Sequence, residues 1–350
     1  MSKIFEEVRL PHITFKNHIA RSATNDYAGN EDGTVSDSQM EIYRELAINE
    51  VGMIITGHYA VCPLGRNDIH QNALWNDKFV ESQRKLVDMV HKNGSKIVAQ
   101  LNHAGAKAQA AAIGGAQPAA PSAVEVMPGV MPRALTVQEI EQIEDDFASA
   151  ARRAKEAGFD GVQVHCAHGY LFSQFIDSAH NKRDDVYGGT VQNRFRIVEE
   201  TLHKVRDAVG ENYPVFIKIH SNAIEGDGQF EDDLLYMLST AKALGAEAAE
   251  ISGCDFAKQP RDKRLYYMDR AVRLRQETGL PVILVGGIRS LAEMDEVLDA
   301  GLDMVSLSRP FICQPDIIKR LVAGERSRCT GCYGCFSCFQ KTGKRCVLHK

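Results

Sequence analysis

The stretch GVQVHCAHGY, residues 161–170, combines the pattern of a buried strand with a group of chemically active side chains. Two valines alternate with Gln163 and His165, which is the period of a strand with one apolar and one polar face. His168 and Tyr170 follow at once, on the loop that leaves the strand. Imidazole and phenol groups donate hydrogen bonds, and a histidine exchanges protons near neutral pH. The stretch predicts a strand ending in a functional loop; a packed histidine and tyrosine is the simpler alternative.

Strand-like and helix-like segments alternate along almost the whole chain. The predicted strands are residues 18–23, 52–56, 96–101, 161–165, 215–219, 248–252, 282–285 and 304–307. The predicted helices are residues 38–49, 77–92, 137–157, 191–209, 231–244, 269–277, 291–300 and 315–321. Eight alternations predict an α/β fold of the closed parallel type, the (β/α)8 or TIM barrel. A doubly wound open sheet is the alternative, but it normally uses fewer strands.

Composition narrows the class of protein. The chain has 350 residues, of which 44% are hydrophobic and 25% charged, as expected for a globular protein with a sizeable core. The net charge of -5 argues against a nucleic-acid partner. The sequence shows neither an apolar run of membrane-spanning length nor a signal peptide, so we expect no membrane association and a cytoplasmic location.

Polar residues gather on the inner face of the predicted barrel, towards the ends of its strands. In the predicted strand 215–219, the aliphatic side chains are expected to face the helices, so Lys218 faces the inside of the barrel. The same alternation places Gln100, Gln163 and Glu250 inside. Barrel active sites lie at this end. Because buried polar groups without partners are costly, the pattern predicts a large polar ligand there.

The loops after the last two strands have the features of a phosphate site. Gly286 and Gly287 follow the seventh strand, and Ser308 and Arg309 follow the eighth. Glycines allow close backbone approach to an anion, and these two loops form the usual phosphate site of barrels. Two long loops, residues 106–135 and 253–267, are expected to be lids or substrate walls; the second carries a basic cluster, Lys258, Arg261, Lys263 and Arg264.

The last 25 residues are rich in cysteine. The spacing C-x2-C-x2-C-x2-C followed by a fifth cysteine is typical of metal ligation, and the residues are Cys329, Cys332, Cys335, Cys338 and Cys346. Four thiolates suit a [4Fe–4S] cluster or zinc. A tail without metal is the remaining alternative. We therefore divide the chain into a barrel, residues 1–325, and a cysteine-rich tail, residues 326–350.

Several motifs together resemble the Old Yellow Enzyme family of FMN-dependent ene-reductases, also called NADH:flavin oxidoreductases. The resemblance covers about residues 5 to 325 and rests on seven motifs. They are KNHIARSATNDY (16–27), AQLNHAG (99–105), APS (120–122), AGFDGVQVHCAHGYL (157–171), NKRDDVYGGTVQNRFR (181–196), VGGI (285–288) and LSRP (307–310). The cysteine-rich tail is similar to that of the dienoyl-CoA reductase branch, with somewhat different spacing.

The resemblance implies a role for each matching position. The residues implied to bind FMN are Ser22, Ala23, Thr24, Asn25, His58, Gln100, Lys218, Gly286, Gly287, Ser308 and Arg309. Lys218 stands where the family commonly has arginine; either cation stabilises negative charge on reduced flavin, but lysine lacks the bidentate fork. His165 and His168 are implied to bind the oxygen of an unsaturated carbonyl substrate, with Tyr27 as a further contact. Tyr170 is implied to be the acid.

The implied activity is transfer of hydride from NAD(P)H through FMN to the activated C=C of a small α,β-unsaturated carbonyl compound. Two alternatives belong to other classes. One is an electron-relay subunit with an iron–sulfur cluster and a partner reductase. The other is a flavin-free aldolase with Lys218 as the Schiff-base nucleophile. The sequence leaves open the alkene, the choice between NADH and NADPH, and whether the chain forms a homo-oligomer.

Overall fold

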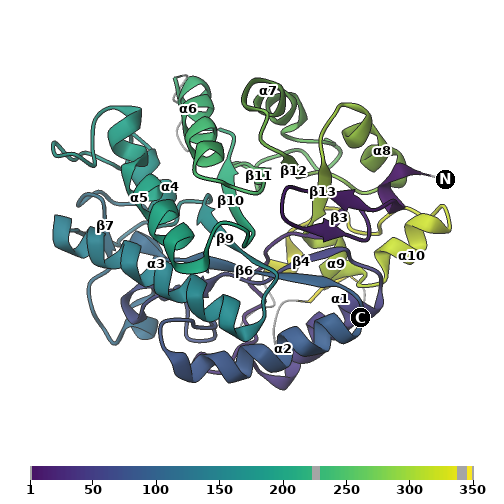
Figure 1. The fold of residues 1–350 in the computed structure, drawn as a ribbon, viewed down its shortest axis with the longest axis horizontal. Coiled ribbons are helices and arrows are strands. Elements are labelled where there is room, and N and C mark those ends of the chain that lie inside the picture. Colours follow the sequence, from purple (N-terminus) through teal and green to yellow (C-terminus); the bar gives the residue numbers. More distant parts are fainter. Residues whose placement is uncertain (1, 223–228, 337–344, 349–350) are drawn as a thin grey trace.

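Eight parallel strands close into a barrel in the part of the chain that the structure describes, residues 2–222, 229–336 and 345–348 of a computed structural model (Figure 1). The strands follow one another around the ring in chain order, and the last pairs with the first. They are β3 (Ile19–Arg21), β4 (Met53–Ile55), β6 (Lys96–Asn102), β9 (Gly161–Cys166), β10 (Val215–His220), β11 (Ala249–Ser252), β12 (Val282–Val285) and β13 (Met304–Leu307). The predicted (β/α)8 fold is confirmed.

Helices surround the barrel on the outside (Figure 1). Those predicted from the sequence are α1 (Asp37–Ile48), α2 (Val80–Lys92), α3 (Val137–Ala157), α5 (Val191–Val209), α6 (Phe230–Ala243), α7 (Met268–Thr278), α8 (Leu291–Asp299) and α10 (Ile317–Val322). The longest, α3, has strong boundary signals at both ends. Thr136 and Glu139 form a capping box, and Gly158 ends the helix at φ 94°, in the left-handed region that glycine adopts without strain. Among the described helices, none has the length and apolar character that a membrane crossing requires.

Several short elements were not predicted. They are the helices α4 (Leu171–Ile176) and α9 (Arg309–Cys313) and the strands β1 (Val8–Arg9), β2 (Thr14–Phe15), β5 (Tyr59–Ala60), β7 (Ala119–Ala120) and β8 (Arg133–Ala134). Strands of two residues are too short to show a period. The β1–β2 hairpin nevertheless has a clear place, because Phe15 packs with Met53, Val98 and Phe216 in one buried cluster inside the barrel. The hairpin therefore fills the amino-terminal end of the barrel.

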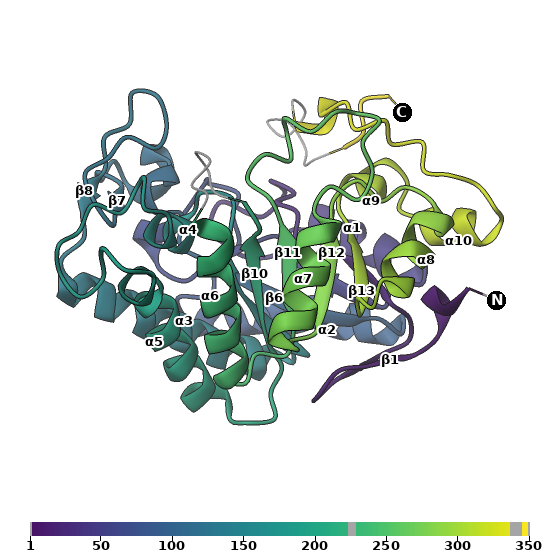
Figure 2. The same ribbon diagram turned by 90° about the horizontal axis from the view of Figure 1, so that it is seen from above.

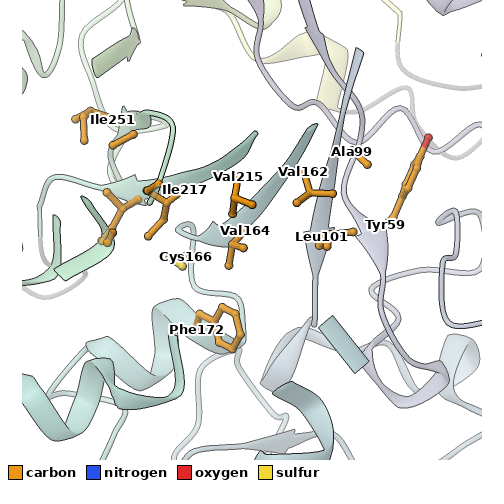
Figure 3. Packing of buried hydrophobic residues seen from close by; sticks show 14 of the residues in the cluster. Tyr59, Ala99, Leu101, Val162, Val164, Cys166, Phe172, Val215, Ile217 and Ile251 are labelled. Carbon is orange, nitrogen blue, oxygen red and sulfur yellow. The ribbon is translucent and has the colours of Figure 1, made fainter. Parts of the chain in front are cut away.

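The main core lies between the strands and the surrounding helices (Figure 3). Val162 and Val164 of β9 and Ile217 of β10 point into this layer, where Phe172 of α4 also packs. The alternate residues of the same strands point inward, as Phe216 does. The side-chain parity inferred from the sequence is thus confirmed. Apolar residues fill one end of the barrel interior and leave the polar residues at the carboxyl end.

The loops and the tail gather at that carboxyl end. Figure 2 shows the tail and the loop between β11 and α7 at the same side of the molecule as β7 and β8, opposite the β1 hairpin. The tail packs on residues 253–267 through aromatic rings, since Phe256 lies 6.2 Å from Tyr333 and 6.4 Å from Phe336 between ring centroids. Tyr333 also donates a hydrogen bond to the carbonyl oxygen of Phe256.

The α3 core contact gives the first prediction. Phe147 is buried and its ring stacks on that of Phe172, with centroids 4.6 Å apart. Phe147→Ala removes this contact and leaves a cavity, so we expect the free energy of unfolding to fall by about 3–5 kcal/mol. Urea unfolding followed by circular dichroism measures the change. Val322→Ala, at an exposed position of α10, should change it by less than about 0.5 kcal/mol. Equal effects of the two substitutions would contradict this account of the core.

Candidate active site

A cavity of about 260 Å³ lies at the carboxyl ends of the barrel strands. Every barrel strand contributes to it, either directly or through the loop that follows. The lining residues are Ser22, Ala23, Thr24, Asn25, Tyr27, His58, Gln100, Lys107, His165, His168, Tyr170, Lys218, Ser252, Phe256, Tyr266, Tyr267, Val285, Gly286, Ser308, Arg309 and Phe336. The mixture of aromatic and hydrogen-bonding groups at the carboxyl ends of barrel strands is typical of a small-molecule site.

A buried ion pair forms the floor of the cavity. The Lys218 ammonium lies 3.1 Å from Glu250 Oε2 and donates to Ser22 Oγ at 2.7 Å. Glu250 is fully buried and accepts three more hydrogen bonds, from Ser22 (2.6 Å), Ser306 (2.8 Å) and Gln163 (3.1 Å). Burial raises the pKa of this carboxyl, but Lys218 and the hydroxyl donors outweigh it and bring the pKa below its usual value. Glu250 is therefore ionised.

His165 and His168 lie side by side on the wall of the cavity, with ring centroids 5.3 Å apart. The backbone N–H of Ala167 donates to His165 Nδ1 at 3.3 Å, which leaves the ring proton on Nε2. His168 Nε2 hydrogen-bonds Ser252 Oγ at 2.9 Å. Burial lowers the pKa of both rings well below the ordinary value, and nearby cations add to the effect. Both imidazoles are therefore neutral at pH 7 and act as hydrogen-bond donors.

The Tyr170 hydroxyl meets His58 across the cavity, with Oη 3.2 Å from His58 Nε2. The Gln71 amide nitrogen contacts His58 Nδ1 at 2.7 Å and the His58 carbonyl oxygen at 3.0 Å. A carbonyl only accepts, so this nitrogen is a donor and Nδ1 is the acceptor. The imidazole proton is thus on Nε2 and is donated to Tyr170 Oη. This arrangement leaves the tyrosine's own proton available to another partner.

Lys107 supports the loop that carries these groups. Its ammonium donates to the carbonyl oxygen of His168 at 2.7 Å and lies 5.4 Å from the centroid of the Tyr170 ring. His168 has φ 62°, a left-handed conformation that is strained for a residue with a side chain. The hydrogen bond from Lys107 holds this turn in place. Burial lowers the pKa of Lys107.

The loops after β12 and β13 form the other part of the lining. Thr24 Oγ1 and Ser308 Oγ hydrogen-bond each other at 2.8 Å, joining the first and last strands of the ring. Gly286 has φ 134° and lines the cavity. The Arg309 guanidinium lies 4.3 Å from the Tyr333 ring centroid and donates to the carbonyl oxygen of Gly331 at 3.3 Å. The tail therefore contacts the cation that the sequence assigns to a phosphate.

Most of the residues implied by the resemblance meet at this cavity. Of the predicted flavin, substrate and acid residues, Gly287 alone is absent from the lining; a Cβ placed on it would lie 2.7 Å from the Tyr266 ring. Gly287 thus supports the close approach of residues 253–267. The predicted wall function of that loop agrees with Phe256, Tyr266 and Tyr267 in the lining, whereas none of its four predicted basic residues lines the cavity. The roles of the individual residues stay predictions.

Some lining residues were missed from the sequence. Lys107 and Phe256 lie within five residues of the ends of β6 and β11, which is a usable signal, whereas Tyr266 and Tyr267 lie at the far end of their loop, just before α7. Phe336 gave no signal, because only the fold brings the tail over the barrel. The pairing of Lys218 with Glu250 was also missed, although both were predicted to face inward.

The cysteines of the tail lie close to Arg309. A small cavity of about 20 Å³ is lined by Cys313 of α9 together with Cys329, Cys332, Cys335 and Cys346. No group of three or more potential ligands with metal-site geometry is present among the residues that the structure describes, and Cys338 lies outside them. The [4Fe–4S] cluster and its zinc alternative stay predictions. The position of Cys313 beside the tail was not expected from the sequence.

Comparisons with known proteins agree on the family. The family model described as "NADH:flavin oxidoreductase / NADH oxidase family" matches residues 3–327. NADH oxidase from Thermoanaerobacter brockii is 33% identical over 336 residues, which are 93% of this chain and 51% of that protein. The chain thus spans about half the length of this relative. NADPH dehydrogenase from Clostridium acetobutylicum is 32% identical over 89% of this chain and 92% of its own length.

A solved structure extends the comparison to three dimensions. The Old Yellow Enzyme homologue from Zymomonas mobilis superposes with a TM-score of 0.81 and 28% identity. The match covers 92% of this chain and 93% of that chain, so the similarity includes the whole barrel.

The buried histidines predict a loss of stability in acid. Burial lowers the pKa of His103 to about 4, whereas an unfolded histidine titrates near 6.5. The folded state therefore binds fewer protons than the unfolded state below that pH, and stability falls as the pH falls. We expect His103 alone to cost about 2 kcal/mol of unfolding free energy at pH 5 relative to pH 8. Urea unfolding at the two pH values measures this.

His103→Gln should flatten this pH dependence by about the same amount, because glutamine has no proton to take up on unfolding. The exposed His203→Gln provides the matched control and should leave the dependence unchanged. If both variants kept the full dependence, His103 would already take up its proton in the folded state.

Proposed function

Because the chain belongs to the NADH:flavin oxidoreductase / NADH oxidase family, we propose that it reduces the activated C=C bond of small α,β-unsaturated carbonyl compounds. The protein is an oxidoreductase whose cofactor is FMN and whose reductant is NAD(P)H. The proposal of alkene reduction rests on one observation: the neutral His165 and His168 and the hydroxyl of Tyr170 lie together at one wall of the cavity. Because the cofactor is FMN, the hypothesis of a flavin-free aldolase has no support.

The residues present fit the cofactor. Lys218 and Gln100 line the floor of the cavity and supply hydrogen-bonding groups for the polar edge of a flavin ring. Arg309 and Ser308 lie beside the Gly286 backbone, where a phosphate needs a cation and close N–H groups. When bound, FMN accepts hydride from NAD(P)H and supplies it to the alkene.

The two histidines bind and polarise the carbonyl group of the substrate. His165 keeps its proton on Nε2 because Nδ1 accepts the Ala167 N–H, so it presents one fixed donor. His168 lies edge-on to it and is held by Ser252. As neutral hydrogen-bond donors, they stabilise the negative charge that develops on the carbonyl oxygen as hydride reaches the β-carbon.

Tyr170 supplies the proton that completes the reduction. Its hydroxyl already accepts a hydrogen bond from His58 Nε2, so its own proton is directed elsewhere, and we assign it to the α-carbon of the alkene. Burial raises the pKa of Tyr170, which opposes proton release. The His58 N–H offsets this effect, because it stabilises the oxygen after the proton has left.

Electron relay is a second candidate function, and the tail supports it. Cys313 and four tail cysteines share one small cavity that Arg309 also lines. A hydrogen bond from the backbone of Gly334 lowers the pKa of Cys332, which favours the thiolate form that metals bind. We propose a [4Fe–4S] cluster held by four of the five predicted cysteines, close to the phosphate end of the flavin.

Tyr170→Phe separates the two half-reactions. Removing the proton donor should slow reduction of cyclohexenone by about 10²- to 10⁴-fold, while reduction of the flavin by NADH changes less than about twofold. Anaerobic stopped-flow absorbance measures each half-reaction. Tyr213→Phe is the matched control, because Tyr213 donates to the Phe159 carbonyl away from the cavity. Equal loss of both half-reactions in Tyr170→Phe would refute its assignment as the acid.

The cluster proposal is tested by metal content. Protein purified without oxygen should contain iron and acid-labile sulfide, and a broad brown absorbance should lie beneath the flavin bands. Cys332→Ser should lose the iron and the brown absorbance while the flavin bands remain. Cys62→Ser, outside the tail, should keep both. A wild-type protein with flavin but neither iron nor zinc would make the tail a structural element and remove the relay.

A further inference from the structure

The ion pair at the cavity floor bears on the charge of the flavin. Lys218 lines the cavity, and Glu250 lies beside it on the neighbouring strand, where the register of β10 and β11 pairs these two residues. Ser22 bridges them, since it accepts from Lys218 and donates to Glu250. A cation that faces a flavin alone favours a negative charge on the reduced ring. Lys218, however, is paired with the carboxylate of Glu250.

Few other charges face the pair. On β9, His165 lies opposite Lys218 in the strand register, and it and the nearby His168 are neutral because burial lowers the pKa of each ring. On β3, Arg21 is buried, but its guanidinium donates to the carbonyl oxygens of Ile55 and Thr24 and lies over the Tyr43 ring, 5.6 Å from its centroid. Arg21 is also absent from the cavity lining. Lys107 and Arg309 also line the cavity, but Lys107 donates to the carbonyl oxygen of His168 and Arg309 lies over the Tyr333 ring. At the cavity floor itself the charged groups are Lys218 and Glu250; burial lowers the pKa of Lys218, and Glu250 opposes this effect.

We propose that Glu250 neutralises Lys218 at the cavity floor, so that reduction of the bound FMN by two electrons takes up two protons instead of one. The balanced reaction is FMN + NADH + H⁺ → FMNH₂ + NAD⁺. NADH brings two electrons and one proton as hydride, and the second proton comes from water. An unpaired lysine would instead favour FMN + NADH → FMNH⁻ + NAD⁺, with no proton taken from water. Glu250 is thus a positioning residue that acts through Lys218.

The inference rests on the proposed placement of the flavin over Lys218 but not on alkene reduction. It differs from the expectation from the sequence, in which Lys218 stabilises a negatively charged reduced flavin; that expectation stays a prediction, and the titration below decides between the two. Two oppositely charged groups in direct contact act together as a dipole. The electric field of a dipole decreases faster with distance than the field of a single charge.

Potentiometric titration of the FMN-loaded protein tests the proposal without NADH or alkene. The midpoint potential is measured from about pH 5.5 to 9, with free FMN in the same cell. The slope of the midpoint potential against pH gives the number of protons taken up with the two electrons. This number is two at low pH and one at high pH, and the pH at which the slope changes is called the break. The wild-type break should lie at or above that of free FMN. In Glu250→Gln it should move down by about one to three pH units, because the Lys218 charge is then uncompensated.

Two further variants complete the double-mutant cycle, and a third serves as a control. Lys218→Met should move the break up, and the double variant Lys218→Met/Glu250→Gln should return it to within about half a unit of wild type. Glu247→Gln is the matched control, because Glu247 is also buried but hydrogen-bonds the backbone and ring of His12, at 2.7 and 2.8 Å, outside the cavity. This variant should leave the break unchanged.

Proton uptake during reduction by NADH gives an independent readout. In weakly buffered solution with an indicator dye, at a pH below the wild-type break and above that of Glu250→Gln, wild type should take up about one proton per flavin and Glu250→Gln markedly less. A wild-type break below that of free FMN would overturn the proposal, even if Glu250→Gln failed to bind FMN. A break that moves with Lys218 but not with Glu250 would also overturn it. If neither residue moved the break, the flavin would not lie over Lys218, whatever the alkene activity.

Discussion

The buried carboxylate of Glu250 holds together the polar layer on which the candidate site is built. It binds side chains from four different parts of the ring, namely Ser22 after β3, Gln163 of β9, Lys218 of β10 and Ser306 of β13. A buried charge is tolerated only when such partners surround it. The polar layer must therefore stay intact as a unit. Below it, the barrel is closed by apolar side chains and the β1–β2 hairpin, and above it lies the cavity.

Much of the fold could be predicted, because the barrel repeats one strong pattern. The alternation in GVQVHC fixed the parity of β9, and the capping box of Thr136 and Glu139 with Gly158 located both ends of α3. Elements without a period were missed. The strands β1 and β2 have two residues each, too few for an alternation to show, and the six residues of α4 are all buried, so no polar face marks its period. Their structure depends on packing against the barrel, which local sequence does not encode.

The candidate site was predicted as a set of residues but not as a set of interactions. The motifs placed His165, His168 and Tyr170 at one strand end, as the structure has them. The contact between Tyr170 and His58 joins residues 112 positions apart, and it depends on the lengths of two loops. The pairing of Lys218 with Glu250 depends on the register of two strands, which a slip of one residue would abolish.

The aromatic walls make the shape of the cavity depend on parts of the chain outside the barrel strands. Phe256, Tyr266 and Tyr267 from one loop and Phe336 from the tail line a space of about 260 Å³. Tyr333 of the tail donates a hydrogen bond to the carbonyl oxygen of Phe256, so the tail and the loop support each other. A substitution in either segment can therefore reshape the cavity while every barrel strand keeps its sequence.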